Sequence, residues 1–425
     1  MSKVRLQKMN HVEKIQILPS STIRQAVSVL EEVKIGIVLI VGEDKKLLGT
    51  ITDGDVRRAL INLVPLDQNV KTIMSENPIV ASRYDSAEKI RELMSQNALL
   101  QIPIVNESNQ IVGIEILEPL IDRTKSLQNP VVLMAGGYGK RLRPFTFDTP
   151  KPLLKVGSKP IAEMILEQLN EAGFKQFFFS VHYKADKLKT YFGNGSKWGV
   201  TIQYLDEAKP LGTAGSLGLL PENLPESPIL VMNSDLLTRV NFQELLRYHE
   251  DQRGVATICA RDYELQVPYG VIETEGTKLV DIAEKPQHHF FVNAGIYVLN
   301  PSVVKKIKNV GAIDMTDVLL GESKASNNVV VFPVHEYWLD IGRVDEFERA
   351  QDEVEREERI RSTKRRSYLY DALIYGGALL FVISAISDLL GFGSGPQQLH
   401  LQCCLDAHGF LLYSPQKTDE DFKKY

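Results

Sequence analysis

Cysteine is scarce in this chain. Its 425 residues include three, which are Cys259 and the adjacent pair Cys403 and Cys404. No two of them have the C-x-x-C spacing, and no cysteine and histidine cluster has the spacing of a zinc site. A disulfide framework is therefore not expected, and we expect reduced thiols, with Cys259 in the core, in a cytoplasmic protein.

An excess of basic charge is also missing. Lys and Arg number 49 against 54 Asp and Glu, which gives a formal net charge of −5. This balance provides no electrostatic footprint for nucleic acid, so we expect no nucleic-acid partner. The first 16 residues contain no apolar segment of the kind found in a signal peptide. The length allows two or three domains.

Long apolar runs are almost absent, with one exception near the C-terminus. Residues 372–387 carry no charge, but a membrane-spanning helix needs about 20 such residues. A basic cluster at 364–366 precedes them and would keep the preceding domains on the cytoplasmic side. A packing helix and a membrane association through 368–392 both remain open. Because 344–364 reads as a charged amphipathic helix, we assign a C-terminal helical tail to 351–425.

Two related segments form a repeat in the first part of the chain. Residues 15–60 and 79–121 each contain a short apolar strand, a Ser or Asp helix start, an amphipathic helix, and two strands joined by a polar turn. We place the first repeat at about 8–64 and the second at about 72–124, within one domain covering 1–124.

This order resembles a tandem pair of CBS domains, an α+β family whose paired repeats often bind adenine nucleotides. The family's Ser/Thr-x-x-Asp pattern stands in the first repeat as Thr52 and Asp55. The resemblance implies that Thr52 meets a phosphate and Asp55 a ribose diol. The second repeat has Ile116 and Pro119 at these places, so at most one nucleotide per pair is expected. Alternatively, Asp55 only caps a helix, and the repeats have a structural or dimerising role.

A second domain is predicted over 129–350. The apolar run 131–135, bounded by Pro and Gly, predicts a buried strand. Helix and strand patterns then alternate up to about residue 252, and the later part is rich in strands. This alternation favours an α/β domain with a Rossmann-like, mostly parallel mixed sheet.

Glycines at 136, 137 and 139 follow the first strand of this domain directly. Such a position suits a backbone that approaches a ligand and offers N–H groups to an anion. A P-loop would need Gly where Met134 stands and Ser or Thr where Arg141 stands. A dinucleotide-binding fingerprint would need a third Gly where Leu142 stands. Both common phosphate-binding loops are therefore excluded.

The remaining pattern, A-G-G-x-G-x-R-L-x-P with P-K-P downstream, resembles the signature of sugar-1-phosphate nucleotidyltransferases, which have a GT-A-like fold. Further segments follow in the family's order: a base-facing loop at 210–215, Asp235 after a strand, sugar-pocket segments at 269–271, 284–286 and 293–295, and a W-x-D-x-G motif at 338–342. The resemblance implies transfer of a nucleoside monophosphate from an NTP to a sugar 1-phosphate, with release of pyrophosphate, to make an NDP-sugar for glycan synthesis.

The resemblance also implies roles for single residues. Arg141 would grip the triphosphate, Lys151 would neutralise charge near the α-phosphate, and Asp235 and Asp340 would share one Mg²⁺. The catalytic set is then Arg141, Lys151 and Asp235. The nucleotide-binding set is Ala135, Gly136, Gly137, Gly139, Glu207, Pro210, Gly212 and Thr213. The sugar-phosphate set is Tyr269, Gly270, Glu284, Lys285 and Asn293. Taken singly, Lys151 also fits a solvated turn, and the two aspartates fit a helix cap or a loop turn.

The layout of a CBS pair followed by a transferase is similar to guanylyltransferases that activate glucosamine 1-phosphate or mannose 1-phosphate, which makes GTP the first candidate. UTP, dTTP and CTP stay open, because proteins that read those bases share much of the 210–215 loop. Two other classes also stay open. One is an adenine-nucleotide-sensing regulatory protein, and the other a membrane-tethered scaffold, each with an inactive transferase domain. We expect a homo-oligomer.

Overall fold

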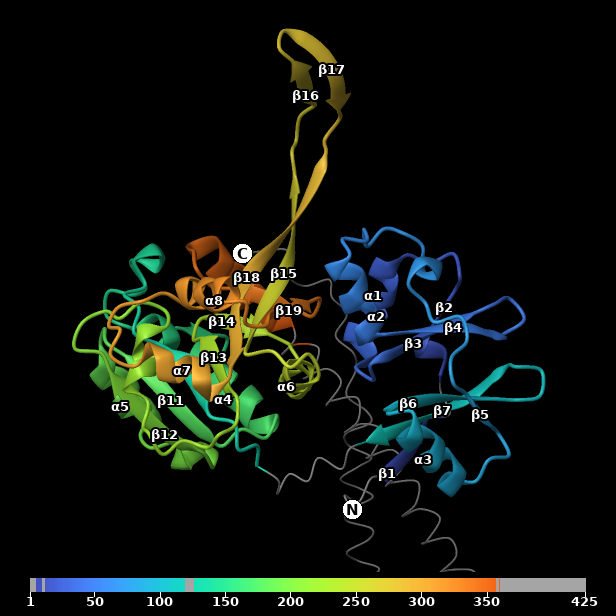
Figure 1. Ribbon diagram of the computed structural model, residues 1–425, viewed down its shortest axis with the longest axis horizontal. Coiled ribbons are helices and arrows are strands. Elements are labelled where there is room, and N and C mark those ends of the chain that lie inside the picture. Colours follow the sequence, from blue (N-terminus) through green and yellow to red (C-terminus); the bar gives the residue numbers. More distant parts are fainter. Residues whose placement is uncertain (1–4, 10–11, 119–125, 357–358, 360–425) are drawn as a thin grey trace, which may run out of the picture. The chain divides into compact units, whose positions relative to one another are not determined.

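The computed structural model describes residues 5–9, 12–118, 126–356 and 359 (Figure 1). The chain divides into two compact units, Met1–Ala350 and Gln351–Tyr425. A helix covers 344–356, within the range where the sequence predicts a charged helix, and the apolar segment 372–387 lies outside the described residues. Among the residues that the structure describes, no helix has the length and apolar character needed to cross a membrane.

Two repeats that share the order strand, helix, strand, strand open the first unit. The first repeat consists of β2 (Gln16–Ile17), α1 (Ile23–Val33), β3 (Ile37–Val41), β4 (Leu47–Thr52) and α2 (Asp53–Ile61). The second consists of β5 (Ala81–Ser82), α3 (Ala87–Gln96), β6 (Gln101–Val105) and β7 (Ile111–Glu118), and β1 (Arg5–Met9) pairs with β7. The register of each strand pair shifts at the matching place, after Ile40 in one repeat and after Ile104 in the other. The α+β repeat expected from the sequence is confirmed.

Short polar side chains start the helices of the repeats. Ser86 caps α3, as expected, by accepting a hydrogen bond from the Lys89 backbone N–H. The cap of α1 is Thr22, whose hydroxyl accepts from Gln25 N at 3.3 Å while its own N–H donates to the Gln25 side chain at 3.0 Å. Such a reciprocal capping box satisfies two backbone donors that a helix start leaves free.

The two repeats pack against each other through their strands and turns. The backbone N–H of Leu47 donates to the carbonyl of Asn109 at 2.9 Å, and the Gln110 side chain donates to the carbonyl of Asp44 at the same distance. An apolar cluster combines Leu39 of the first repeat with Ile114 of the second, and both side chains are fully buried. The repeats therefore share one apolar cluster at their contact, as the resemblance to a CBS pair implies.

A seven-stranded mixed sheet forms the second domain. Its order is β12 (Thr201–Asp206), β11 (Gln176–Val181), β8 (Val131–Met134), β13 (Ile229–Asn233), β18 (Gln287–Leu299), β15 (Ala256–Gln266) and β19 (Val329–Val334). The first four strands are parallel, β18 runs antiparallel to both of its neighbours, and β19 is parallel to β15. The expected Rossmann-like mixed sheet is confirmed.

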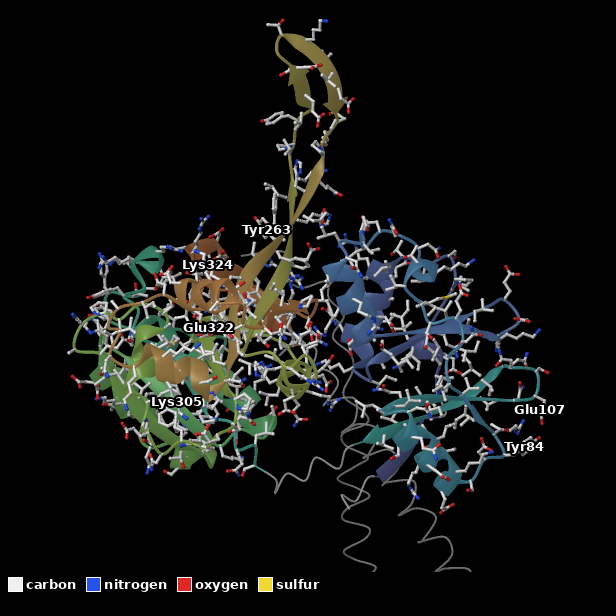
Figure 2. The ribbon with its side chains drawn as sticks, viewed as in Figure 1. Tyr84, Glu107, Tyr263, Lys305, Glu322 and Lys324 are labelled. Atoms are coloured by element: carbon white, nitrogen blue, oxygen red, sulfur yellow. The ribbon has the colours of Figure 1, made fainter. Side chains whose placement is uncertain are left out.

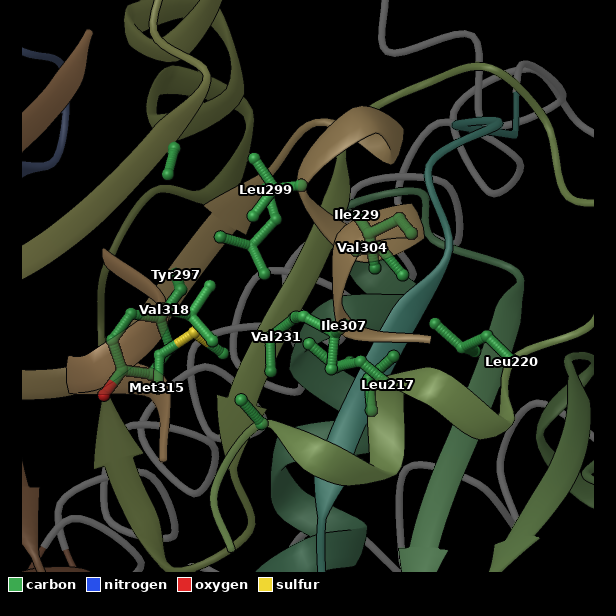
Figure 3. Packing of buried hydrophobic residues seen from close by; sticks show 14 of the residues in the cluster. Leu217, Leu220, Ile229, Val231, Tyr297, Leu299, Val304, Ile307, Met315 and Val318 are labelled. Atoms are coloured by element: carbon green, nitrogen blue, oxygen red, sulfur yellow. The ribbon is translucent and has the colours of Figure 1, made fainter. Parts of the chain in front are cut away.

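Helices cover both faces of this sheet, because its strands are apolar on both sides. They are α4 (Ile161–Glu171), α5 (Ala185–Phe192), α6 (Phe242–Asp251), α7 (Pro301–Ile307) and α8 (Met315–Lys324). On one face, Val231 and Tyr297 of the strands pack against Ile307 and Met315 of α7 and α8 (Figure 3). On the other face, the Phe179 ring of β11 lies 5.0 Å from that of Phe192 in α5. The hydrophobic core of this domain therefore has two layers, one on each face of the sheet. Cys259 is buried in β15, as predicted.

An arm extends from the sheet. β15 and β18 remain paired out to Gln266 and Gln287, and between them β16 (Val271–Glu275) and β17 (Lys278–Ala283) form a terminal hairpin (Figure 1). Figure 2 shows Tyr263 on this arm, with the side chains of the hairpin beyond it. Apolar side chains stay uncovered there, and Ile272 is 61 % exposed.

Candidate active site

Two neighbouring parallel strands end side by side at one edge of the sheet. Asn233, the last residue of β13, is in register with Met134, the last residue of β8. The hydroxyl of Ser234 then donates to the Met134 carbonyl at 2.7 Å. Residues 135–139, which we call the glycine loop, follow β8, and Asp235 follows β13. The glycine loop and Asp235 therefore lie next to each other. In open α/β sheets, ligands bind at this carboxyl edge.

A short pair of strands brings a second carboxylate to this edge. β14 (Leu236–Thr238) pairs antiparallel with β20 (Trp338–Asp340), and Leu236 faces Asp340 in this register. The backbone N–H of Ile341 donates to the Asp235 carbonyl at 3.0 Å. Asp235 and Asp340, about a hundred positions apart in the chain, are thus held together by backbone hydrogen bonds.

Lys151 places its ammonium group between these carboxylates. It stands in a short 3-10 helix, Lys151–Leu153, and its side chain is 14 % exposed. Its Nζ forms an ion pair with Asp235 Oδ2 and lies 3.9 Å from Asp340 Oδ1. The P-K-P segment therefore supplies a largely buried cation and not a solvated turn.

The electrostatics of the two aspartates favour a further cation. Burial, and then the charge of Asp235, raises the pKa of Asp340 to about 6, although Lys151 acts in the opposite direction. Among the described residues, the Oδ1 atoms of Asp235 and Asp340 are buried acceptors without a hydrogen-bond partner. Unsatisfied buried carboxylate oxygens are uncommon and fit a hard divalent cation.

The metal-binding groups available from the protein are few. Within the described ranges, no group of three or more His, Cys, Asp and Glu side chains could hold a metal. Mg²⁺ commonly binds through one or two carboxylates, with substrate phosphates and water completing its shell. The residues present therefore fit a cation that arrives with a phosphate substrate.

The glycine loop turns sharply above Lys151. Gly139 has φ +61°, and its carbonyl accepts from the Thr146 hydroxyl at 2.8 Å. A Cβ at this position would stand 3.0 Å from Thr146 Cγ2 and 3.3 Å from Lys151 Cβ. Arg141, in the short helix that follows, is exposed, and its charge acts against the overall rise in the pKa of Asp340. Arg141, Lys151 and Asp340 thus share one electrostatic site.

Glu207, which directly follows β12, lies beneath the glycine loop. Its Oε2 accepts from the Leu211 backbone N–H at 2.8 Å, and its Oε1 accepts from the Ser180 hydroxyl. A Cβ added to Gly136 would approach Glu207 Oε1 to 2.8 Å. The structure therefore brings Gly136 and Glu207 together, and only glycine fits without moving the carboxylate. Ala135 and Gly137 belong to the same loop, and a Cβ on Gly137 would meet nothing within 4 Å.

The loop 210–215 is fixed by the start of α8. The Asp314 side chain accepts from the Thr213 backbone N–H at 2.9 Å, and the Thr213 hydroxyl accepts from the Met315 N–H at 2.8 Å. Gly212 has φ +77°, and a Cβ there would lie 2.6 Å from the Ile313 carbonyl oxygen. Pro210 is exposed at the start of this loop. Sequence reasoning did not select Asp314, although an aspartate directly before a helix is a familiar cap signal.

The five predicted sugar-phosphate residues separate into two groups. Asn293 is in β18 near the sheet, where its side chain accepts from the Gly295 N–H at 2.9 Å and donates to the Tyr297 hydroxyl at 2.6 Å. The other four are exposed on the arm: Tyr269, Gly270, Glu284 and Lys285. Gly270 and Glu284 are neighbours, because a Cβ on Gly270 would lie 3.0 Å from Glu284 Oε2. The structure does not bring the arm residues to Lys151 and the aspartates.

Gly136 allows a direct test of the nucleotide-binding role that the sequence predicts for this loop. We expect Gly136→Ala to displace the Glu207 carboxylate, because the added Cβ would stand 2.8 Å from its Oε1, and to weaken nucleotide binding about tenfold or more. Calorimetry with a non-hydrolysable GTP analogue measures this. Gly321→Ala in α8, where a Cβ would meet nothing within 4 Å, is the matched control. Equal affinity of the two variants would contradict the assignment of Gly136.

Comparisons with known proteins identify the families to which the two parts of the chain are similar. The nucleotidyl transferase family matches residues 130–357, and the CBS domain family matches 9–62 and 70–114. A mannose-1-phosphate guanyltransferase of Yarrowia lipolytica is 37 % identical over 223 residues, which cover 51 % of this chain and 61 % of that protein. The mannose-1-phosphate guanylyltransferase catalytic subunit beta of Drosophila melanogaster is 35 % identical over 222 residues, with 51 % and 60 % covered.

The chain thus spans about three fifths of the length of the curated relatives it matches. The solved structure of HddC from Yersinia pseudotuberculosis superimposes with a TM-score of 0.42 at 23 % identity, over 53 % of this chain and 99 % of that one. The family match over 130–357 covers more than half of the 425 residues and includes the glycine loop, Lys151, Asp235 and Asp340. The chain belongs to the nucleotidyl transferase family and carries a tandem CBS pair before its transferase domain.

Proposed function

We propose that this protein transfers GMP from GTP to a sugar 1-phosphate, releases pyrophosphate and forms a GDP-sugar for glycan synthesis. The observation that carries the proposal is the cluster of Lys151, Asp235 and Asp340 behind a glycine loop, at the carboxyl edge of a parallel-rich sheet. We expect the reaction to take place in the cytoplasm.

The chemistry needs positioning and positive charge more than a reactive side chain. An oxygen of the sugar phosphate attacks the α-phosphorus of the triphosphate, the bond between the α- and β-phosphates breaks, and pyrophosphate leaves. Lys151 would hold the α-phosphate, and Arg141 would bind the triphosphate with its planar guanidinium. The glycine loop, Glu207 and the loop 210–215 would bind base and ribose.

Mg²⁺ is the cofactor that we propose for the two aspartates. Bound by Asp235 and Asp340, it would neutralise phosphate charge. The proposal rests on the two buried Oδ1 atoms without partners and on the raised pKa of Asp340. Lys151 already provides one positive charge there, and it lies close enough to both carboxylates to reduce their repulsion.

The identity of the substrates rests on the relatives. Those with 35–37 % identity are named as mannose-1-phosphate guanylyltransferases, so GTP with mannose 1-phosphate, or a similar hexose 1-phosphate such as glucosamine 1-phosphate, is the pair to test first. UTP, dTTP and CTP are the competing nucleotides. The intact charged cluster argues against a transferase domain that binds substrate without turnover.

Pyrophosphate release over a matrix of four NTPs and several sugar 1-phosphates tests the function. We expect activity with GTP, and a fall in kcat of about a hundredfold or more in Asp235→Asn and Asp340→Asn, because each substitution removes a carboxylate that would hold the Mg²⁺ needed to neutralise charge in the transition state. The melting temperature without metal should barely change, since either substitution also relieves repulsion between the carboxylates. Near-normal turnover in either variant would remove the metal assignment.

Lys285 tests the role of the arm. We propose that the arm brings Lys285 to the sugar phosphate when the substrate binds, with Tyr269, Gly270, Glu284 and Asn293 around the sugar. Lys285→Ala should then raise the KM for the sugar 1-phosphate about tenfold or more, with little effect on the KM for GTP, since a charge-assisted contact to one substrate is lost. Lys278→Ala at the exposed hairpin is the control. An unchanged KM would remove Lys285 from the site.

The CBS pair gives a separate proposal, one adenine nucleotide bound by Thr52 and Asp55. In the structure, Asp55 Oδ2 accepts from the N–H of Thr52 at 2.8 Å and from its hydroxyl at 2.7 Å, while Oδ1 pairs with Arg58. Asp55 is the third residue of α2, and these hydrogen bonds make it part of a capping box with Thr52. This is the capping role that the sequence left open, and a bound nucleotide would have to share or replace these contacts.

Calorimetry with AMP, ADP and ATP decides between ligand binding and capping alone. We expect one nucleotide to bind per chain and Asp55→Ala to abolish binding, because the ribose diol loses its acceptor. Asp85→Ala is the matched control in the second repeat, where Asp85 accepts from Ser82 N at 2.8 Å and pairs with Lys89. Failure of the wild type to bind any adenine nucleotide would leave the repeats a structural or dimerising module.

A further inference from the structure

Arg57 of the CBS pair is buried against residues of the transferase domain. Its side chain is 3 % exposed, and its guanidinium lies 3.9 Å from the centre of the Phe332 ring. Nη2 donates to Glu336 Oε1 at 2.7 Å, Nε donates to Glu244 Oε1 at 3.3 Å, and Nη1 donates to the Pro333 carbonyl. One side chain of α2 thus holds three groups from α6, β19 and the segment after β19.

Burying the charged guanidinium of Arg57 costs free energy, so this contact differs from an ordinary ion pair on the protein surface. Burial acts to lower the pKa of Arg57, but the charges of Glu336 and Glu244 raise it overall. At Glu336, burial acts to raise the pKa, but the charges of Arg57 and His335, together with hydrogen bonds, lower it overall, so the carboxylate stays ionised. Buried ion pairs seldom add much stability, and their clearer use is to fix one arrangement of the elements they join. The neighbouring Arg58, by contrast, is 69 % exposed.

The segment that Arg57 holds leads directly into the candidate active site. β19 ends at Val334, β20 begins at Trp338, and Glu336 stands four residues before Asp340. Nη1 of Arg261 in β15 donates to the carbonyls of residues 334, 335 and 336 at 3.1, 2.8 and 3.0 Å. The segment is therefore held from the transferase side by Arg261 and from the CBS side by Arg57.

We propose that Arg57 is a positioning residue for the transferase reaction. By fixing the Pro333 carbonyl and Glu336, it sets the start of β20 and so the place of Asp340 beside Asp235. The inference rests on the proposed function only for its activity readout. In this proposal, the CBS pair helps to hold residues of the transferase site in position, in addition to any role in binding a nucleotide.

A second contact on the same face of α2 supports the proposal that this helix positions the segment before β20. Asp53, the first residue of the helix, places Oδ1 3.2 Å from Nε2 of His335, whose side chain is 3 % exposed. Asp53 and Arg57 are four residues apart, so they lie on one face of the helix. Asp53 also stands between Thr52 and Asp55, which places the proposed nucleotide site at the same helix end.

Three variants and one control test the proposal in the full-length protein. Arg57→Met removes the positioning group, and Arg57→Lys keeps the charge without the planar fork. The double variant Arg57→Met/Glu336→Gln removes the uncompensated carboxylate. Arg91→Met changes an exposed arginine on α3 of the second repeat and is the control. Each is measured for kcat, for the KM of GTP, for the Mg²⁺ concentration at half-maximal rate, and for backbone hydrogen exchange over 335–341.

We expect Arg57→Met to lower kcat about tenfold or more, because a small displacement of a site residue is enough to slow a reaction that depends on alignment. The KM for GTP should stay within about twofold, the Mg²⁺ requirement should rise, and exchange over 335–341 should become faster. Arg57→Lys should lie between wild type and Arg57→Met. The double variant should regain thermal stability without regaining kcat, whereas a purely structural role would restore both.

Wild-type kcat, Mg²⁺ requirement and exchange in Arg57→Met would overturn the proposal, and so would recovery of kcat in the double variant. If the wild type releases no pyrophosphate with any substrate pair, the proposed function fails. Hydrogen exchange over 335–341 then still decides the positioning role, because it does not depend on turnover. Faster exchange in Arg57→Met but not in Arg91→Met would support the proposal, and unchanged exchange would refute it.

Discussion

The pairing of β14 with β20 is the constraint on which the candidate site depends. It forces two carboxylates, Asp235 and Asp340, into proximity although their charges repel, and the pKa of Asp340 rises to about 6 as a result of burial and of this repulsion. Backbone hydrogen bonds and the ion pair with Lys151 hold the arrangement together. Unfavourable electrostatics imposed by a folded backbone are typical of sites that bind a cation or a charged substrate.

The remaining fold supplies the geometry for this constraint. The parallel strands β8 and β13 end in register, so the glycine loop and Asp235 emerge at one edge. The helices on both faces bury nearly all of the central strands β8, β11 and β13, which makes this part of the sheet a rigid base. Small residues fit where backbone must come close to side chains, as at Gly136 above Glu207. A site assembled from several loops can be accurate only if the strands beneath it do not move.

The CBS pair contributes to the same arrangement through one helix face. α2 carries the capping box of Thr52 and Asp55 at its start, and Asp53 and Arg57 contact the segment between β19 and β20. A ligand can change activity only by a different affinity for two states of the protein. Because α2 carries the proposed nucleotide site at its start and contacts the segment that leads into β20, which bears Asp340, such coupling could act through a shift of this helix.

The sequence by itself determined the repeats, the alternation of helix and strand, and the glycine loop with its lysine and aspartates, because hydrophobic periodicity, caps and short motifs are encoded by residues close in the chain. The tertiary structure decided which of these groups meet. It places Tyr269, Glu284 and Lys285 on an arm, although the sequence groups them with the sugar pocket. Arg57 and Arg58 are chemically identical neighbours, yet only Arg57 is buried, since Glu336, 279 positions away, is delivered to it by the fold. Burial of a charge depends on distant partners, which a local pattern does not encode.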